Sequence, residues 1–326
     1  MYNELEETTN KFKRRLAIFT AILVIGLIGV FANNIFINNG LLGLLCFILV
    51  IGGAGGSAYT YFQFKRETGD KQEQLIQEKA NEIIPGARCD KDSGFTKETL
   101  MASDLEARRG NIYRSNFLIS GEYEHVKFDA ADVYYANQTS SGKSSHTTVL
   151  FDGILMIFDF ENKFDEKIKI FEKNSFWRRG LLTSRDGAYG MEKMETESIL
   201  FEEKFESYST DEQVFYKVIT PVVIELILEI EKDYPGLVSY SFRDGKCYVA
   251  LSSKEASYEL RLKDGFAKSV ERIEKNIILI KEIIEGFGLS GNTFTSFESR
   301  YQKISEIAEE RKKEREKLLE ELNTWG

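Results

Sequence analysis

The sequence predicts an α+β protein with an N-terminal two-helix transmembrane hairpin, then a cytoplasmic domain with a mostly antiparallel sheet and flanking helices. A long charged C-terminal helix is expected to end the chain. Three observations predict this class. Two apolar stretches lie close together near the N-terminus, strand-like segments with short turns fill the middle, and the residues after 300 are rich in charged side chains.

The first predicted unit is residues 1–66, with spans at about 16–36 and 41–62. Each stretch is long enough to cross a bilayer as a helix, because about 20 residues at about 1.5 Å each span the hydrocarbon core of about 30 Å. The first stretch is too long for a cleaved signal peptide, and a second follows at once. We therefore expect a multi-pass protein of the plasma (cytoplasmic) membrane.

Basic residues flank the two spans and are absent between them. By the positive-inside rule, this pattern predicts that both termini lie in the cytoplasm and that the turn lies outside. The spans carry no ionisable side chain of the kind that ion pathways and proton relays need, which argues against a conduit. The flanking residues are Lys11, Lys13, Arg14 and Arg15 before the first span, and Lys65 and Arg66 after the second.

Glycines are predicted to form the packing faces of the hairpin. Gly52 and Gly56 have the small-xxx-small spacing that lets helix backbones approach closely in lipid, and Gly26 and Gly29 on the first span can supply the facing notch. Two interpretations stay open. The glycines pack the hairpin against itself, or they form an oligomerisation face.

Charge and cysteine content narrow the function classes. The formal net charge is −9, and residues 1–66 carry six Lys and Arg against three Glu, so the remainder sums to −12. An acidic soluble part argues against a nucleic-acid partner, which needs a basic face. The three cysteines are far apart and form no CxxC pair, as suits a reducing cytoplasm.

Residues 67–110 are predicted to be a membrane-proximal helical segment. A helix over Asp70–Ile84 is expected to continue from the second span until Pro85 and Gly86 stop it. A second, shorter helix is expected from about Thr96 to Arg109.

Residues 111–290 are predicted to be the cytoplasmic α+β domain. Its first strands are joined by short turns, which predicts an antiparallel meander. A capping box at Thr210 and Gln213 predicts a helix that Pro221 interrupts, and an Asp-Gly turn predicts a hairpin. The expected segments are strands at 111–120, 123–136, 146–160 and 167–171, a loop at 137–145, an extended run at 199–208, a hairpin of 237–242 with 246–251, and a helix at 268–287.

Residues 291–326 are predicted to be a linker and a charged C-terminal helix. A spacing of four and three residues is compatible with a coiled-coil seam. The positions with this spacing are Tyr301, Ile304, Ala308, Arg311, Arg315, Leu318, Leu322 and Trp325. Arg311 and Arg315 occupy consecutive seam positions and weaken that interpretation. A solvated or domain-covering helix and an oligomerising coil both stay open.

Short chemical motifs predict no catalytic residue, no cofactor and no metal. Asn137–Ser144 resembles half of a phosphate loop, but strand-forming residues follow it where a helix is required. Asp90–Gly94 lacks the ligand spacing of a Ca²⁺ loop and is predicted to be a turn. His125 and His146 occupy separate predicted strands, so a shared metal or acid-base role requires those strands to be neighbours.

Trp177, Arg178 and Arg179 form the candidate contact site of the soluble part. An aromatic side chain followed by two guanidinium groups suits a lipid headgroup or an acidic partner. The alternative is a loop that packs one Trp into the domain.

Three segments together carry a family resemblance: residues 151–164, residues 201–209 followed by Ile219-Thr220-Pro221, and Ser241-Phe242 before a hairpin to 248–250. They resemble the bacterial family catalogued as domain of unknown function 3137. The resemblance implies two N-terminal spans, a cytoplasmic α+β domain and a LemA-type membrane protein as a partner. It implies no activity, and Phe215-Tyr216-Lys217 departs from the arginine common in that family.

The leading hypothesis is therefore a membrane-anchored cytoplasmic binding or scaffold module that acts with a membrane-protein partner, with oligomerisation through the hairpin or the C-terminal helix left open. Two alternatives remain. One is an enzyme with an unrecognised carboxylate-based site, and the other is a sensor of anionic lipid that uses Arg178 and Arg179.

Overall fold

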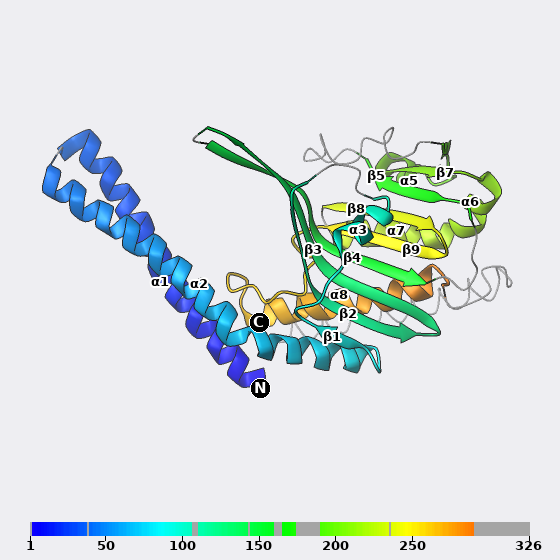
Figure 1. Ribbon diagram of the computed structural model, residues 1–326, viewed down its shortest axis with the longest axis horizontal. Helices are drawn as coiled ribbons and strands as arrows, with labels where there is room; N and C mark the ends of the chain where they lie inside the picture. Colours follow the sequence, from blue (N-terminus) through cyan, green and yellow to red (C-terminus); the bar gives the residue numbers. More distant parts are fainter. Residues whose placement is uncertain are drawn as a thin grey trace, which may run out of the picture.

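A computed structural model describes residues 2–37, 39–105, 110–142, 144–159, 165–173, 190–234 and 236–289. A long helical hairpin projects from one end of a domain in which helices cover a twisted sheet (Figure 1). The α+β class is confirmed, with two long apolar helices at the N-terminus. The predicted charged helix within 291–326 lies outside the described residues.

The hairpin consists of α1 (Tyr2–Ala32), the π-helical turn η1 (Asn33–Ile37) and α2 (Gly40–Ile83). Asn39 caps α2, because its side-chain oxygen accepts from the backbone N–H of Leu41 at 3.0 Å. Both helices are long and apolar enough to cross a membrane by length and composition. The helix predicted over Asp70–Ile84 is the second half of α2, which runs through residue 66 without a break.

The described residues form one nine-stranded antiparallel sheet of order β1-β2-β3-β4-β9-β8-β5-β7-β6. The predicted meander holds for β2, β3 and β4 and then fails, because the β8–β9 hairpin lies between β4 and β5. The strands are β1 (Arg88–Asp90), β2 (Ile112–Tyr123), β3 (Val126–Ser141), β4 (Ser144–Asp159), β5 (Ile168–Glu172), β6 (Glu192–Met194), β7 (Phe205–Ser209), β8 (Leu237–Arg243) and β9 (Lys246–Ser252).

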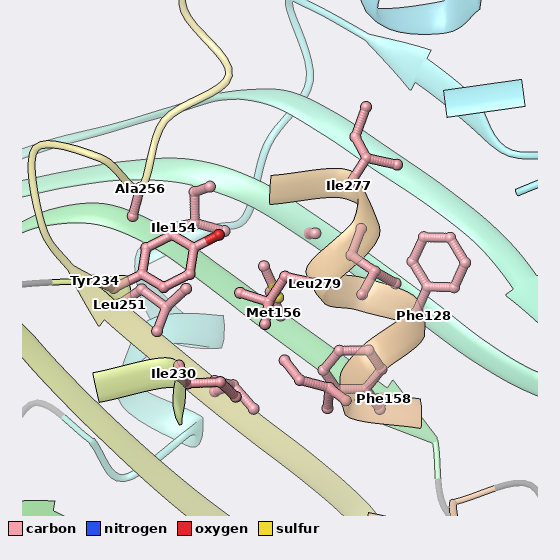
Figure 2. Close-up of a cluster of buried hydrophobic side chains, with 14 of the residues drawn as sticks. Phe128, Ile154, Met156, Phe158, Ile230, Tyr234, Leu251, Ala256, Ile277 and Leu279 are labelled. Atoms are coloured by element: carbon pink, nitrogen blue, oxygen red, sulfur yellow. The ribbon is translucent and has the colours of Figure 1, made fainter. Parts of the chain in front are cut away.

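The main core lies between one face of the sheet and three helices: α2, α7 (Pro221–Asp233) and α8 (Phe266–Gly286). Figure 2 shows Met156 of β4 beside Leu279 of α8, in a cluster that also includes Phe158. Alternate residues of a strand point to opposite faces of the sheet, so the intervening apolar residues of the same strands form a second cluster on the other face. There Leu155 and Tyr248 pack with Leu100 of α3 (Lys97–Ala102).

Three local predictions are wrong for reasons of capping and turn geometry. The extended run predicted at 199–208 begins as α5 (Ile199–Lys204), because the Ser198 hydroxyl accepts from the N–H of Phe201, which is buried. The loop predicted at 137–145 is mostly strand, since β3 and β4 continue to a tight turn at Gly142, whose φ is +60°. The helix after β7, α6 (Glu212–Val218), is capped by Asp211 rather than Thr210.

Other local predictions are confirmed. Thr220 caps α7 with Pro221 in its first turn, which explains the predicted interruption. The β8–β9 hairpin turns at Asp244 and Gly245, whose φ angles of 53° and 70° suit the predicted Asp-Gly turn. At the expected turn, the Asp90 carboxylate accepts hydrogen bonds from the backbone N–H groups of Asp92 and Ser93. The helix predicted from about Thr96 to Arg109 is confirmed only at its start: α3 is capped by Thr96 and ends at Ala102.

Candidate functional site

Close helix contact in the hairpin centres on Gly26, Gly29, Gly53 and Gly56. A Cβ atom added at Gly53 would lie 2.6 Å from the backbone nitrogen of Leu23, and one at Gly26 would lie 2.8 Å from that of Val50. Gly29 faces Cys46 and Gly56 faces the ring of Phe19. These glycines lie where α1 and α2 approach each other.

Gly52, proposed from the sequence together with Gly56, lies elsewhere. A Cβ atom added at Gly52 would have no neighbour within 4 Å, so this residue does not contact α1. The sequence analysis missed Gly53, although it is adjacent to Gly52. One residue along a helix turns the side-chain direction by about 100°, which is enough to change the face.

The most organised polar cluster is a junction where β3, α2 and α8 meet the loop 253–262. Asp132 of β3 holds this loop: its carboxylate accepts from the Ser257 hydroxyl at 2.8 Å and from the backbone N–H of Tyr258 at 2.9 Å. Part of Asp132 reaches the surface, whereas its carboxylate is enclosed by these partners. Burial raises the pKa of Asp132 to about 7, and the two hydrogen bonds oppose this shift.

α8 supplies one guanidinium group and one amide group to the junction. Arg272 is buried and donates from Nη2 to the Glu259 carbonyl at 2.6 Å and from Nη1 to the Asp264 carboxylate at 2.7 Å. Asn276, also buried, donates to the Ser257 carbonyl at 3.0 Å. These bonds satisfy the carbonyl groups of a loop that crosses the core edge without regular structure.

α2 joins the same loop. Gln72 is buried and donates to the Tyr258 carbonyl at 3.1 Å, so Tyr258 is held by the sheet through its N–H and by α2 through its carbonyl. Closer to the predicted span, Lys65 pairs with Glu259 at 2.8 Å. The loop therefore connects α2 to the sheet.

A second charged cluster lies on the other face of the sheet. Lys169 of β5 is buried and pairs with the carboxylate of Asp104, which also lies 3.3 Å from a guanidinium nitrogen of Arg243 on β8. Burial lowers the pKa of Lys169, and Asp104 opposes this effect. The arrangement neutralises a buried cation where α3 meets the sheet.

The two clusters do not converge on one cleft. Asp132 shares its face with Phe128 and Ala130 of the main core, whereas Lys169 lies on the opposite face beside Phe171. Within the described ranges, no group of three or more His, Cys, Asp or Glu side chains is placed to hold a metal ion. The perturbed pKa values of Asp132 and Lys169 are therefore explained by separate structural roles.

Several candidates from the sequence remain apart or outside the structure. Trp177, Arg178 and Arg179 lie outside the described residues, so the structure tests neither the contact site nor the packed loop predicted for them. His125 lies in the β2–β3 turn and His146 lies near the far end of β4, paired with Thr139. They lie at opposite ends of β3, which runs from Val126 to Ser141, and so cannot share a ligand.

Sequence reasoning missed the junction residues Asp132, Ser257 and Arg272. One signal was present, because an aspartate among Ala130, Ala131 and Val133 stands at a core-facing position of a strand. Its partners are more than 120 residues away, so no local pattern identifies them.

The comparisons with known proteins bear on the family. The family described as "Protein of unknown function (DUF3137)" matches residues 149–289, which confirms the resemblance inferred from the sequence. The crystal structure of the mycobacterial trehalose monomycolate transport factor A, TtfA, is similar over 63% of this chain and 94% of that chain, with 9% identity and a TM-score of 0.32. No curated protein matches the chain.

Proposed function

We propose that this chain is an integral protein of the cytoplasmic membrane and that its sheet domain is a non-enzymatic binding or scaffold module on the cytoplasmic side. In this proposal residues 1–66 are the anchor, 67–110 the membrane-proximal segment, 111–290 the binding domain and 291–326 a linker and charged helix. The domain acts with a membrane-protein partner, and a LemA-type protein is the first candidate to test.

The observation that carries the proposal is the continuity of α2. This helix begins at Gly40 in the apolar hairpin and ends at Ile83 against the sheet domain, without an interruption. A helix of 44 residues is about 66 Å long at about 1.5 Å per residue, so one rigid element extends well beyond a bilayer core of about 30 Å. Such a connection sets the position of the domain relative to the membrane.

The first turns of α1, which precede the first predicted span, strengthen this connection. Phe12 and Phe64 are buried against each other with ring centroids 5.8 Å apart, and Glu4 pairs with Lys71. Tyr2 packs its ring on Phe266 at the start of α8, at 4.7 Å. Both helices of the hairpin therefore contact the domain.

The charges support a cytoplasmic domain. The basic flanks of both spans lie at the end of the hairpin from which the domain extends, and Lys65 pairs there with Glu259. The positive-inside rule assigns this end to the cytoplasm.

A labelling experiment tests the topology. Gly40→Cys places a thiol between the spans, where a Cβ atom has no neighbour within 4 Å, and Glu197→Cys places one on an exposed position of the domain. We expect a membrane-impermeant maleimide to label the first variant in intact cells and the second only after lysis, with the wild-type chain as background. Labelling of Glu197→Cys in intact cells would overturn the topology.

A second experiment tests the scaffold role. The full chain is purified in mild detergent beside an unrelated two-span membrane protein of similar size. We expect a membrane protein to co-purify reproducibly with this chain and not with the control. Recovery of the chain alone would refute a scaffold.

A further inference from the structure

Three exposed apolar side chains lie at the end of the sheet farthest from the hairpin. Ile199 and Leu200 at the start of α5 are 78% and 51% exposed, and Tyr216 of α6 is 49% exposed. Figure 1 shows α5 and α6 beside β7 at the opposite end of the domain from α1 and α2. Large apolar side chains that cluster on a surface mark a binding site more often than single ones do.

Local geometry joins these three residues into one surface. α5 buries Phe201 in the core, and this contact turns Ile199 and Leu200 outward. The Tyr216 hydroxyl donates to the Glu195 carbonyl at 2.9 Å and so fixes α6 to the segment that precedes α5. Thr196 and Glu202 are hydrogen-bonded at 2.8 Å, which folds that segment back onto α5. We call residues 192–217 the distal acidic surface.

Charge distinguishes this surface from the rest of the chain. Residues 192–217 contain eight Asp and Glu against three Lys, a net charge of −5 over 26 positions, whereas the whole chain carries −9. Lys204 is also neutralised by Glu231. Five of the acidic side chains in this segment are exposed: Glu192, Glu195, Glu197, Glu203 and Glu212.

This combination selects among the occupants of the surface. A second copy would bring the same negative charge to a symmetric contact, and anionic headgroups would be repelled in the same way. The surface also lies at the end of the domain away from the hairpin. In the proposed function the hairpin is in the membrane, so the surface is distant from the bilayer. A basic protein segment with apolar side chains on one face complements both the charge and the apolar residues.

We propose that the distal acidic surface binds a basic amphipathic helix of a partner protein. This inference rests on the proposed function, because it names the class of partner that the scaffold binds on the cytoplasmic side. Ile199 and Leu200 contact the apolar face of that helix, and the surrounding carboxylates pair with its Lys and Arg side chains.

Site-specific cross-linking tests the proposal with defined probes. The full chain is held in lipid nanodiscs, with the photo-reactive residue p-benzoylphenylalanine in place of Leu200. In a matched control the same residue replaces Ile278, which is 43% exposed on α8. The probes are a helical peptide of Leu and Lys and its counterpart of Leu and Glu, which share one apolar face and differ in charge.

We expect the Leu and Lys peptide to be cross-linked from position 200 and not from position 278. The yield should fall severalfold when the salt concentration rises from about 0.1 M to about 1 M, because the screening length then falls from about 10 Å to about 3 Å. The double charge reversal Glu195→Lys and Glu197→Lys changes two exposed side chains and should remove the cross-link.

Three results would overturn the proposal: equal yields from positions 200 and 278, equal yields with the two peptides, or a yield that survives the charge reversal. If these occur while a membrane protein still co-purifies with the full chain, the scaffold role stands and its contact surface lies elsewhere. If no partner co-purifies, the scaffold role fails whatever the peptide result.

Discussion

Asp132 should make the folded domain less stable as the pH rises through neutrality. Its carboxylate is enclosed by Ser257 and Tyr258, and burial raises its pKa to about 7. In the unfolded chain the pKa is about 3.9. The folded state therefore binds the proton more tightly, so the contribution of this residue is fully present below about pH 4 and is lost as the pH rises through 7.

The size of the effect follows from the shift. A change from the ordinary value of 3.8 to about 7 is about three units, and each unit is about 1.4 kcal/mol, so at most about 4 kcal/mol is lost between acid and neutral pH. Asp132→Asn keeps an oxygen to accept from the Tyr258 N–H and removes the titration. Because other carboxylates also titrate, the informative quantity is the difference between the wild type and this variant.

Thermal unfolding of the full chain in detergent, followed by circular dichroism at several pH values, measures this difference. Relative to Asp132→Asn, the unfolding midpoint of the wild type should fall by up to roughly 8–16 °C between pH 4 and pH 8, because at most about 4 kcal/mol is lost and each kcal/mol shifts the midpoint by about 2–4 °C. A difference between the two proteins that stays constant over this range would refute the assignment of a buried, protonated carboxyl at Asp132.

Three further predictions concern packing and charge. Gly53→Leu should loosen the hairpin, because its side chain meets the backbone of Leu23, whereas Gly52→Leu should be tolerated; protease cleavage of the reconstituted chain compares them, and equal resistance would contradict the packing. Lys169→Met should lower the free energy of unfolding by about 1–3 kcal/mol, and the double variant Lys169→Met with Asp104→Asn should lower it by less. A double-mutant cycle measures the coupling, and simple additivity of the two single effects would argue against the pair. Gln72→Leu should speed hydrogen exchange of the Tyr258 amide about 5-fold for a lost contribution of about 1 kcal/mol; an unchanged rate would mean that α2 does not hold the loop.

Local patterns predicted the parts of this fold whose cause is local. The length of the apolar stretches, the Asp-Gly turn at 244–245 and the Thr220-Pro221 helix start each depend on residues a few positions apart. The same reasoning failed at Ile199, where a strand-like composition begins a helix because Ser198 caps it and Phe201 finds space in the core. The capping hydrogen bond needs no distant partner, but the burial does.

The candidate sites depended on distant contacts, and the sequence predicted them poorly. Ser257 and Tyr258 are 125 and 126 residues from Asp132, and Gln72 is 186 residues from the loop it holds. The distal acidic surface could be seen in part as a run of Glu and Asp after residue 191. Whether Ile199 and Leu200 faced the core or the solvent depended on where α5 packed.

The sequence by itself determined two long apolar stretches, their basic flanks, the α+β class and the family resemblance, because these are properties of composition and of spacing along the chain. The tertiary structure decided that β9 lies beside β4, that α2 reaches the sheet through the Tyr258 loop, and that three apolar side chains stay exposed at the far end. Each of these depends on which distant segments compete best for one edge or one face, and that competition is settled only when the whole chain packs.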